Sequence, residues 1–199
     1  MSKPPASPRV VILDNYDSFT YNLYQRIGEI SGTPAKVFRN DRVTVEQVFA
    51  LEPTHLIVSP GPGNPEDPSY FGVCRQVLLS VGSRAAVLGV CLGLQGIGAA
   101  FGGRIMRAPE PMHGKARLVT HDGEGIFRDI PNPMLAMRYH SLVVDPAHVP
   151  SCLRITARTE DGLIMGLVHR ELPIQGVQFH PESIGTPHGV ELLRNFILA

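Results

Sequence analysis

Tryptophan is absent from the sequence, cysteine occurs only three times, and there is no long uninterrupted apolar segment. Three widely spaced cysteines cannot build a disulfide framework or a CxxC metal site, which favours a reducing cytoplasm. Without an apolar run long enough to cross a bilayer, we expect no membrane association. The first eight residues, MSKPPASP, do not resemble a secretory signal, and we predict a flexible tail over residues 1–8.

An excess of charge of either sign is also lacking. Lysine plus arginine and aspartate plus glutamate number 18 each among 199 residues. Because basic and acidic residues do not cluster in the sequence, it gives no indication of a charged surface that would bind nucleic acid. A hydrophobic content of 43% is enough for one well-buried core. We therefore predict a single domain over residues 9–199, with small molecules and neutral protein surfaces as partners.

Short apolar runs rich in β-branched residues alternate with segments of helical period. This alternation predicts an α/β fold with an open, mostly parallel sheet flanked by helices. Asp17 or Ser18 is expected to cap the first helix and Gly32 to end it. Strands are expected at 10–13, 35–38, 56–58 and 85–90, and further helices over 69–81 and from Cys91 to a stop at Gly102 and Gly103.

The sequence pattern changes between residues 114 and 168. There the strand-like runs GKARLVT, LRITART and LIMGLVH are separated by glycine and proline turns. They predict a small antiparallel sub-sheet of the same domain. Beyond it, Thr186 and Pro187 are expected to be the cap and first residue of a closing helix through Leu198.

The segment AAVLGVCLGLQ places Cys91 between a buried strand and a helix, with Gly89 and Gly93 two residues away on either side. This is the layout of a nucleophile elbow. A helix N-terminus favours a thiolate and offers N–H groups to an oxyanion. The competing interpretation is a small buried hydrophobe, the role we assign to Cys74 and Cys152.

A histidine and a glutamate follow the apolar strand of PIQGVQFHPES, near the end of the chain. Pro181 favours an extended backbone at His180, and residues two apart in an extended segment lie on one side. Glu182 can then orient the His180 imidazole, which serves as the base for the nucleophile if the fold brings it to Cys91. No histidine set such as HExxH is present, so we predict no metal and no cofactor.

The loop SPGPGNPEDP after the strand at 56–58 is rich in glycine and proline. Gly61 and Gly63 allow a close approach of backbone to substrate. An N–H group of this loop can complement that of Leu92 in an oxyanion hole. Taken by itself, the loop is also compatible with an ordinary connection between a strand and a helix.

Together, GVCLGLQ, SPGPG and GVQFHPES resemble the glutaminase domain of class I, triad-type, glutamine amidotransferases, from Val10 to Leu198. Within that family, LDNYDSFTYNLYQ, MHGK at 112–115 and RYHSLVV at 138–144 are most similar to the small subunit of anthranilate synthase and of aminodeoxychorismate synthase. The resemblance implies the same α/β fold and no cofactor in this chain.

The resemblance also implies roles for particular residues. Cys91 would attack the side-chain carboxamide of L-glutamine and form a γ-glutamyl thioester, while His180, steadied by Glu182, would protonate the departing ammonia. The N–H groups of Gly61 and Leu92 would hold the oxyanion. Substrate contacts are expected at Gly61, Pro62, Gly63, Gln95, Ser141 and Leu142.

Ammonia would pass to a larger chorismate-using subunit, most simply that of anthranilate synthase in tryptophan biosynthesis, with aminodeoxychorismate synthase in folate biosynthesis, or service to both, as alternatives. By the same resemblance, the loops bearing His113 and His140 would lie near that partner. The sequence departs from the family at Leu94, where such subunits usually carry histidine. This change could affect substrate positioning or signalling to the partner.

Two other interpretations remain open at this point. A stand-alone γ-glutamyl hydrolase of similar fold would show high glutaminase turnover without a partner. A non-catalytic scaffold of the same fold would show no chemistry at Cys91. An amidotransferase subunit instead predicts weak activity alone and more activity on binding the synthase, because uncoupled ammonia release wastes glutamine.

Overall fold

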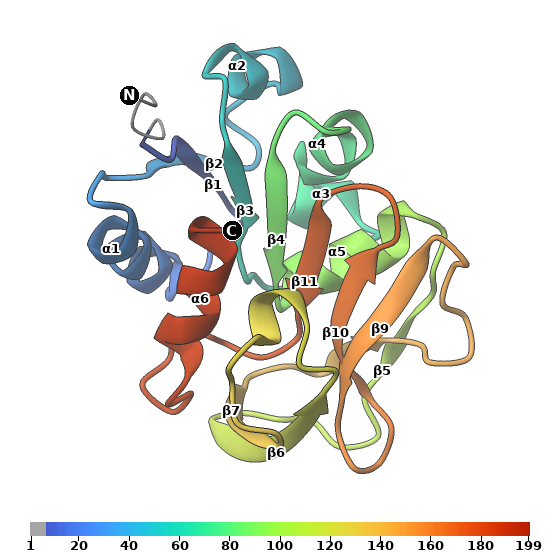
Figure 1. The fold of residues 1–199 in the computed structure, drawn as a ribbon. Helices are drawn as coiled ribbons and strands as arrows, with labels where there is room; N and C mark the ends of the chain where they lie inside the picture. The colour runs from blue at the N-terminus through green and yellow to red at the C-terminus, as the bar shows by residue number, and fades with distance from the viewer. Residues whose placement is uncertain (1–6) are drawn as a thin grey trace.

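The computed structural model describes residues 7–199 and contains a nine-stranded sheet in the order β2-β1-β3-β4-β11-β10-β9-β6-β7 (Figure 1). Strands β2, β1, β3, β4 and β11 run parallel, and β10, β9, β6 and β7 continue the sheet in antiparallel fashion. Its strands are β1 (Val10–Asp14), β2 (Lys36–Arg39), β3 (His55–Val58), β4 (Ala86–Val90), β6 (Lys115–His121), β7 (Met134–Arg138), β9 (Leu153–Arg158), β10 (Ile164–His169) and β11 (Ile174–Val177).

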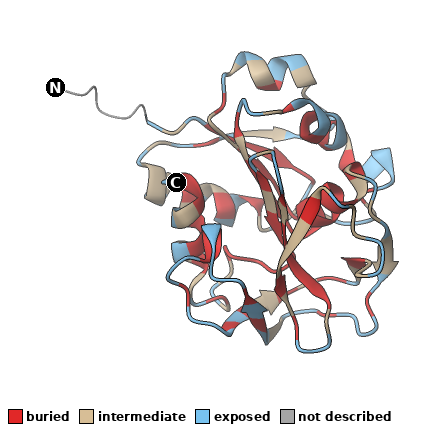
Figure 2. Cartoon of the chain, turned by 45° about the vertical axis from the view of Figure 1, so that its right-hand side comes forward, coloured by how far each residue is buried: buried red, intermediate tan, exposed pale blue. Residues whose placement is uncertain are grey.

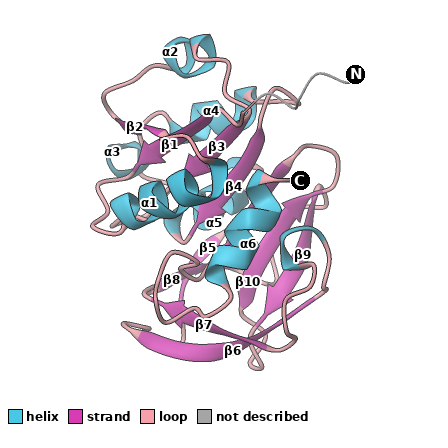
Figure 3. Cartoon of the chain, turned by 60° about the vertical axis from the view of Figure 1, so that its left-hand side comes forward, coloured by secondary structure: helices cyan, strands magenta, loops and turns pink. Residues whose placement is uncertain are grey.

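The helices lie on both faces of the sheet, as the alternating sequence pattern predicts. Helices α1 and α6 lie together on one face (Figure 3), and α4 and α5 pack on the other. The helices are α1 (Thr20–Ser31), α2 (Val45–Ala50), α3 (Pro68–Phe71), α4 (Cys74–Ser80), α5 (Leu92–Ala100) and α6 (Gly189–Ile197), with a 3-10 turn η1 at Gly125–Phe127.

Side chains of the central strands alternate between two hydrophobic cores. In β1, Val10 and Ile12 face the core beneath α1 and α6, whereas Val11 and Leu13 face the core beneath α4 and α5. This alternation follows from the two-residue period of a strand. Figure 2 shows the buried residues concentrated along these central strands. Both faces are covered, which explains why the sequence of β1 is continuously apolar up to Asp14.

The predicted antiparallel sub-sheet is joined to the parallel part within one continuous sheet. Strands β9, β10 and β6 correspond to the three predicted runs, and they extend the main sheet through the β10–β11 pairing. A separate two-stranded sheet is formed by β5 (Ile105–Arg107) and β8 (Leu142–Val144), which pair antiparallel. The predicted α/β class is confirmed, and the antiparallel region is larger than expected.

Two predicted helix starts are wrong. The N-cap of α1 is Phe19, because the Asp17 carboxylate accepts a hydrogen bond from the Phe19 N–H in a turn that precedes the helix. The last helix, α6, begins at Gly189 after His188. The Thr186 hydroxyl does not cap it, since it donates to the carbonyl oxygen of His180. The predicted end of α1 at Gly32 is confirmed.

The helix predicted over 69–81 is divided in two. Gly72 separates α3 from α4 with φ 47°, a conformation that suits glycine. A Cβ atom there would lie 2.5 Å from the carbonyl oxygen of Asn40, so the break is fixed by a contact with a distant segment. Helix α2 is an additional element, and Thr44 and Gln47 form a capping box at its start. The predicted flexible tail over 1–8 lies outside the described residues except for Ser7 and Pro8.

The elbow glycine Gly93 generates a stability prediction. In Gly93→Ala, the new Cβ would lie 2.3 Å from the carbonyl oxygen of Val58, a backbone atom that cannot rotate away. We expect the free energy of unfolding to fall by about 1–3 kcal/mol, measured by chemical denaturation. In the matched control Gly28→Ala, at an open position of α1, stability should rise by about 1 kcal/mol. Equal stability of Gly93→Ala and the parent would contradict the tight packing of strand on helix.

Candidate active site

Cys91 lies at the sharp turn between β4 and α5. Its backbone has φ 53° and ψ −102°, an unfavourable conformation for a residue with a side chain. The turn is tight because α5 approaches β4 closely: a Cβ on Gly89 would lie 2.5 Å from the Gly93 carbonyl. The elbow expected from the two flanking glycines is therefore present, with Cys91 6% exposed at the start of the helix.

His180 and Glu182 lie just beyond the end of β11, the strand that pairs with β4. The Glu182 carboxylate oxygen Oε1 lies 2.6 Å from His180 Nδ1, so the predicted pairing is present. The predicted extended backbone is wrong, because Pro181 and Glu182 lie in a turn in which the Ser183 N–H donates to the His180 carbonyl oxygen. Because β4 and β11 are parallel neighbours, their carboxyl ends deliver Cys91 and His180 to the same edge of the sheet. Both His180 and Glu182 are buried, at 2% and 4% exposure.

The electrostatic setting of His180 favours its charged form. Burial by itself lowers the pKa of His180, but the interactions with the Cys91 side chain and the Glu182 carboxylate outweigh burial and raise the pKa well above its ordinary value. Nδ1 is held by Glu182, which leaves Nε2 as the nitrogen for the sulfur. Nε2 makes no hydrogen bond of good geometry among the described residues. The arrangement thus suits a charged imidazolium beside the Cys91 sulfur.

The glycine-rich loop reaches the nucleophile from the other neighbouring strand, β3. Gly61 packs so closely that a Cβ there would lie 2.8 Å from the side chain of Leu92 and 2.5 Å from that of Asn15. Leu92 is the first residue of α5, where an N–H group has no acceptor within the helix. The two predicted oxyanion residues are therefore adjacent in space. Pro62 and Gly63 continue the loop at the surface.

Asn15 connects the end of β1 to the start of this loop, and sequence reasoning did not single it out. Its N–H donates to the Ser59 hydroxyl and its side-chain amide donates to the Ser59 carbonyl, both at 2.8 Å. Its side-chain oxygen accepts from Asn40 at 2.8 Å and from the Cys74 thiol at 3.3 Å. All of these groups are buried. The network holds Ser59, and with it the loop that carries Gly61.

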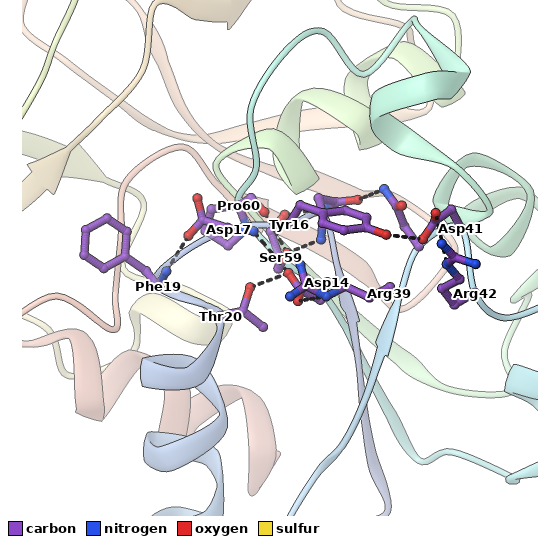
Figure 4. Close-up of polar contacts among 12 residues, drawn as sticks. Asp14, Tyr16, Asp17, Phe19, Thr20, Arg39, Asp41, Arg42, Ser59 and Pro60 are labelled. Atoms are coloured by element: carbon purple, nitrogen blue, oxygen red, sulfur yellow. Dashed lines mark hydrogen bonds and ion pairs between the residues drawn. The ribbon is translucent and has the colours of Figure 1, made fainter.

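The β1–α1 turn that contains Asn15 also approaches the histidine. Figure 4 shows Asp17 and Phe19 in this turn, with Asp14 accepting from Thr20 at its base. The Phe19 ring lies edge-on to the His180 ring at 5.8 Å between centroids. Burial raises the pKa of Asp17, and His180 is one of the charges acting on it. The turn therefore contacts both the loop that carries Gly61 and the His180 ring.

The predicted substrate residue Gln95 lies on α5 and joins three segments. Its side-chain amide donates to the carbonyl oxygen of Leu142 at 2.8 Å and to Gln178 Oε1 at 3.1 Å. Ser141 and Leu142 line a cavity of about 660 Å³ together with Gly63. Gly63, Ser141 and Leu142 thus line one cavity, and Gln95 is joined to its wall through the Leu142 carbonyl; Gly61, Pro62 and Gln95 are not among the lining residues.

Gln178 is a second residue that sequence reasoning missed. It is fully buried, and its amide nitrogen lies 3.5 Å from Cys91 Sγ. A signal was present in the sequence: Gln178 lies two residues before His180, in the short segment that follows the strand carrying the predicted base.

The two histidines predicted near a partner differ in exposure. His113 is exposed and packs edge-on to Tyr139, which in turn packs on His180 at 5.1 Å between ring centroids. His140 is only 4% exposed, so its side chain does not lie on the surface. Its Nε2 accepts from Arg138, and burial together with that guanidinium lowers the pKa of His140 to about 4. His140 is therefore neutral at neutral pH.

Leu94 and the other two cysteines belong to the structure of the fold. Leu94 is fully buried in the hydrophobic core beneath α4 and α5. Leu94 is thus a packing residue of the core, and this packing explains a leucine at this position without any contact with substrate. Burial raises the pKa of Cys74 far above its ordinary value, which disfavours a thiolate there. Cys152 is half-buried and lies away from the elbow, before β9.

Comparison with known proteins gives a consistent result along nearly the whole chain. Residues 11–199 match the family described as glutamine amidotransferase class-I. Anthranilate synthase component 2 of Azospirillum brasilense is 53% identical and covers 94% of each chain. Aminodeoxychorismate/anthranilate synthase component 2 of Bacillus subtilis is 47% identical over 94% of this chain and 95% of its own. Aminodeoxychorismate synthase component 2 of Escherichia coli is 46% identical over 94% and 98%.

The fold is shared with more distant proteins of known structure. A putative GMP synthase subunit from Thermoplasma acidophilum superimposes with a TM-score of 0.85 at 24% identity, over 96% of this chain and 92% of that chain. A glutamine amidotransferase from Thermotoga maritima gives a TM-score of 0.70 at 15% identity, over 88% and 76%. These similarities concern the fold. No helix among the described residues is long and apolar enough to cross a membrane.

The contact between Glu182 and His180 generates a pH prediction. Glu182 raises the pKa of His180, so Glu182→Gln removes a charge that retains the ring proton. We expect His180 to lose its proton at a lower pH than in the parent, measured by nitrogen-15 NMR titration of labelled histidine. In the control Glu191→Gln, an exposed position on α6, the titration should not move. An unchanged His180 midpoint in Glu182→Gln would contradict the assigned role of the carboxylate.

Proposed function

Because the chain belongs to the class-I glutamine amidotransferase family, we propose that it hydrolyses L-glutamine through Cys91 and delivers ammonia to a larger, chorismate-using synthase subunit. The observation that carries this proposal is the convergence of a strained Cys91, the His180–Glu182 pair and the Gly61 loop at the ends of three adjacent parallel strands. The small number of cysteines supports a cytoplasmic location as part of the same proposal.

The reaction begins with attack of the Cys91 sulfur on the carboxamide carbon of glutamine. A carbon–sulfur bond forms, and the developing negative oxygen is held by the N–H groups of Leu92 and Gly61. When the oxyanion collapses, the carbon–nitrogen bond breaks and His180 gives its proton to the departing ammonia. A γ-glutamyl thioester on Cys91 remains.

The second half of the reaction regenerates the enzyme. The His180 imidazole, now neutral, takes a proton from water as the water oxygen attacks the thioester carbon. Glutamate leaves, and the Cys91 thiolate reforms beside the imidazolium. Glu182 stabilises the charged ring at both stages, because its carboxylate contacts Nδ1 at 2.6 Å.

The amino-acid end of glutamine is assigned to the cavity lined by Gly63, Ser141 and Leu142. Gln95 donates both of its amide hydrogens to other protein groups, Leu142 and Gln178. Its side-chain oxygen thus remains as an acceptor for the ammonium group of the substrate. Gly63 is exposed and lines this cavity, and the exposed Pro62 precedes it in the loop.

The synthase that receives the ammonia is proposed to be that of anthranilate, because the similar component 2 proteins of Azospirillum brasilense and Methanothermobacter thermautotrophicus bear that name at 53% and 51% identity. Aminodeoxychorismate synthase is the second candidate, and the Bacillus subtilis relative carries both names. Capture of the larger subunit, followed by analysis of the product made from glutamine and chorismate, distinguishes them.

The partner surface is proposed to include the exposed His113 loop, which reaches the site through Tyr139 and His180. His140 is assigned to the interior side of that surface, since it is buried against Arg138. Glutaminase turnover should be low for the isolated chain and should rise when the larger subunit binds. High turnover without a partner would instead favour a stand-alone hydrolase.

Replacing the nucleophile separates ammonia production from ammonia use. In the complex with the larger subunit, Cys91→Ser should abolish glutamine-dependent amination of chorismate and leave ammonia-dependent amination within about twofold of the parent. The matched control Cys152→Ser, at a half-buried site away from the elbow, should retain both activities. Equal loss of both activities in Cys91→Ser would indicate a failure of assembly and would contradict the assignment.

A further inference from the structure

Gln178 lies between the proposed glutamine site and the nucleophile. It follows β11 directly, is fully buried, and extends its side chain toward the Cys91–His180 edge of the sheet. An amide in such a position is costly to bury unless its hydrogen-bonding groups have partners. Both ends of this amide have partners, and both partners belong to the site.

The orientation of the amide is fixed by its neighbour. Gln95 Nε2 is a donor, so the Gln178 group that faces it at 3.1 Å must be the oxygen. The nitrogen of Gln178 therefore faces Cys91 Sγ, at 3.5 Å. Three hydrogen bonds then run in sequence, from Gln95 to the Leu142 carbonyl, from Gln95 to Gln178, and from Gln178 to the sulfur.

We infer that Gln178 is a hydrogen-bond donor to the Cys91 thiolate, and that it links the position of bound glutamine to the position of the sulfur. The inference rests on the proposed function for the identity of the nucleophile and of the substrate. An N–H donor stabilises a thiolate more than a thiol, because the interaction is strengthened by the negative charge.

The donor also restricts where the sulfur can lie. His180 and Gln178 both lie just beyond the end of β11, the strand that pairs with β4, so both side chains approach Cys91 from the side of β11. The oxyanion donors Gly61 and Leu92 approach from the side of β3 and α5. The donors Gly61 and Leu92 hold the oxygen of the substrate carbonyl. The sulfur can attack the carbon of that carbonyl only if it is fixed between these donors and the side chains of Gln178 and His180.

The hydrogen bond between Gln95 and Gln178 also makes the interaction of Gln178 with the sulfur depend on substrate. Gln95 already holds the Leu142 carbonyl beside the cavity, and hydrogen bonds arranged in sequence strengthen one another. When glutamine occupies the cavity and contacts Gln95, the polarisation passes through Gln178 to the sulfur.

Two substitutions test the amide nitrogen and the amide oxygen of Gln178 separately. Gln178→Met is close in size but removes both the donor to Cys91 and the acceptor for Gln95. Gln178→Glu removes the donor and keeps an oxygen for Gln95. The matched control is Gln175→Met, a half-buried glutamine within β11 whose side chain has no hydrogen bond to Cys91 or Gln95 among the described residues.

The first measurement is alkylation of Cys91 by iodoacetamide as a function of pH, followed by peptide mass spectrometry on the isolated chain. We expect the half-maximal rate to move to higher pH by about one unit in Gln178→Met, a tenfold effect that corresponds to the loss of one hydrogen bond to an ion. The shift should be larger in Gln178→Glu, because its carboxylate also repels the negative charge of a thiolate. The Gln175→Met curve should match that of the parent. Unchanged curves in both Gln178 variants, with thermal unfolding like the parent, would overturn the inference.

The second measurement is steady-state glutamine-dependent synthesis by the complex. Gln178→Glu should lower kcat about tenfold and leave KM for glutamine within about twofold, because the Gln95 contact is kept. Gln178→Met should lower kcat and also raise KM several-fold. A merely structural role would change stability without this separation of kcat from KM. If instead the parent Cys91 itself resists alkylation and Cys91→Ser stays active, the proposed function fails, and not only the role of Gln178.

Discussion

The strained backbone of Cys91 is the constraint on which the rest of the site depends. A positive φ at a residue with a side chain is unfavourable by about 1–3 kcal/mol, and it persists only where surrounding packing enforces it. Here the packing is enforced by Gly89 and Gly93, which bring α5 against β4 and β3 more closely than any other residue allows. The same turn that strains the backbone places the sulfur at the N-terminus of α5, with Leu92 N–H beside it.

The parallel strands on either side of β4 carry the other groups of the site. Strand β11 brings His180, the proposed general acid, and the Glu182 carboxylate, and β3 brings the Gly61 loop, the proposed source of an oxyanion donor. Strand β1 is not adjacent to the nucleophile, but its Asn15 holds Ser59 at the base of that loop, and the following turn packs Phe19 on His180. The parallel arrangement has two consequences. The helices that connect the parallel strands cover both faces of the sheet, and the carboxyl ends of the strands bring groups from distant parts of the chain to one edge.

Local sequence patterns predicted the elements and the residues whose chemistry is visible in short motifs. The strands, the elbow at Cys91 and the His180–Glu182 pair depend on spacing within a few residues, so they could be predicted. The break at Gly72 and the use of Thr186 could not, because each is decided by a contact with a segment far away in sequence. Asn15 and Gln178 were missed for a related reason: an amide has no reactivity of its own, and its role depends on which groups the fold places beside it.

The central claim is that Cys91 is a uniquely reactive thiolate in a site shaped for the glutamine side chain. Treatment with an electrophilic glutamine analogue, in the presence of the larger subunit, followed by peptide mass spectrometry, tests this claim most directly. The account predicts one adduct, on the peptide that contains Cys91, with protection by added L-glutamine and no modification of Cys74 or Cys152. An adduct on either of the other cysteines, or none at Cys91 in the assembled complex, would contradict it.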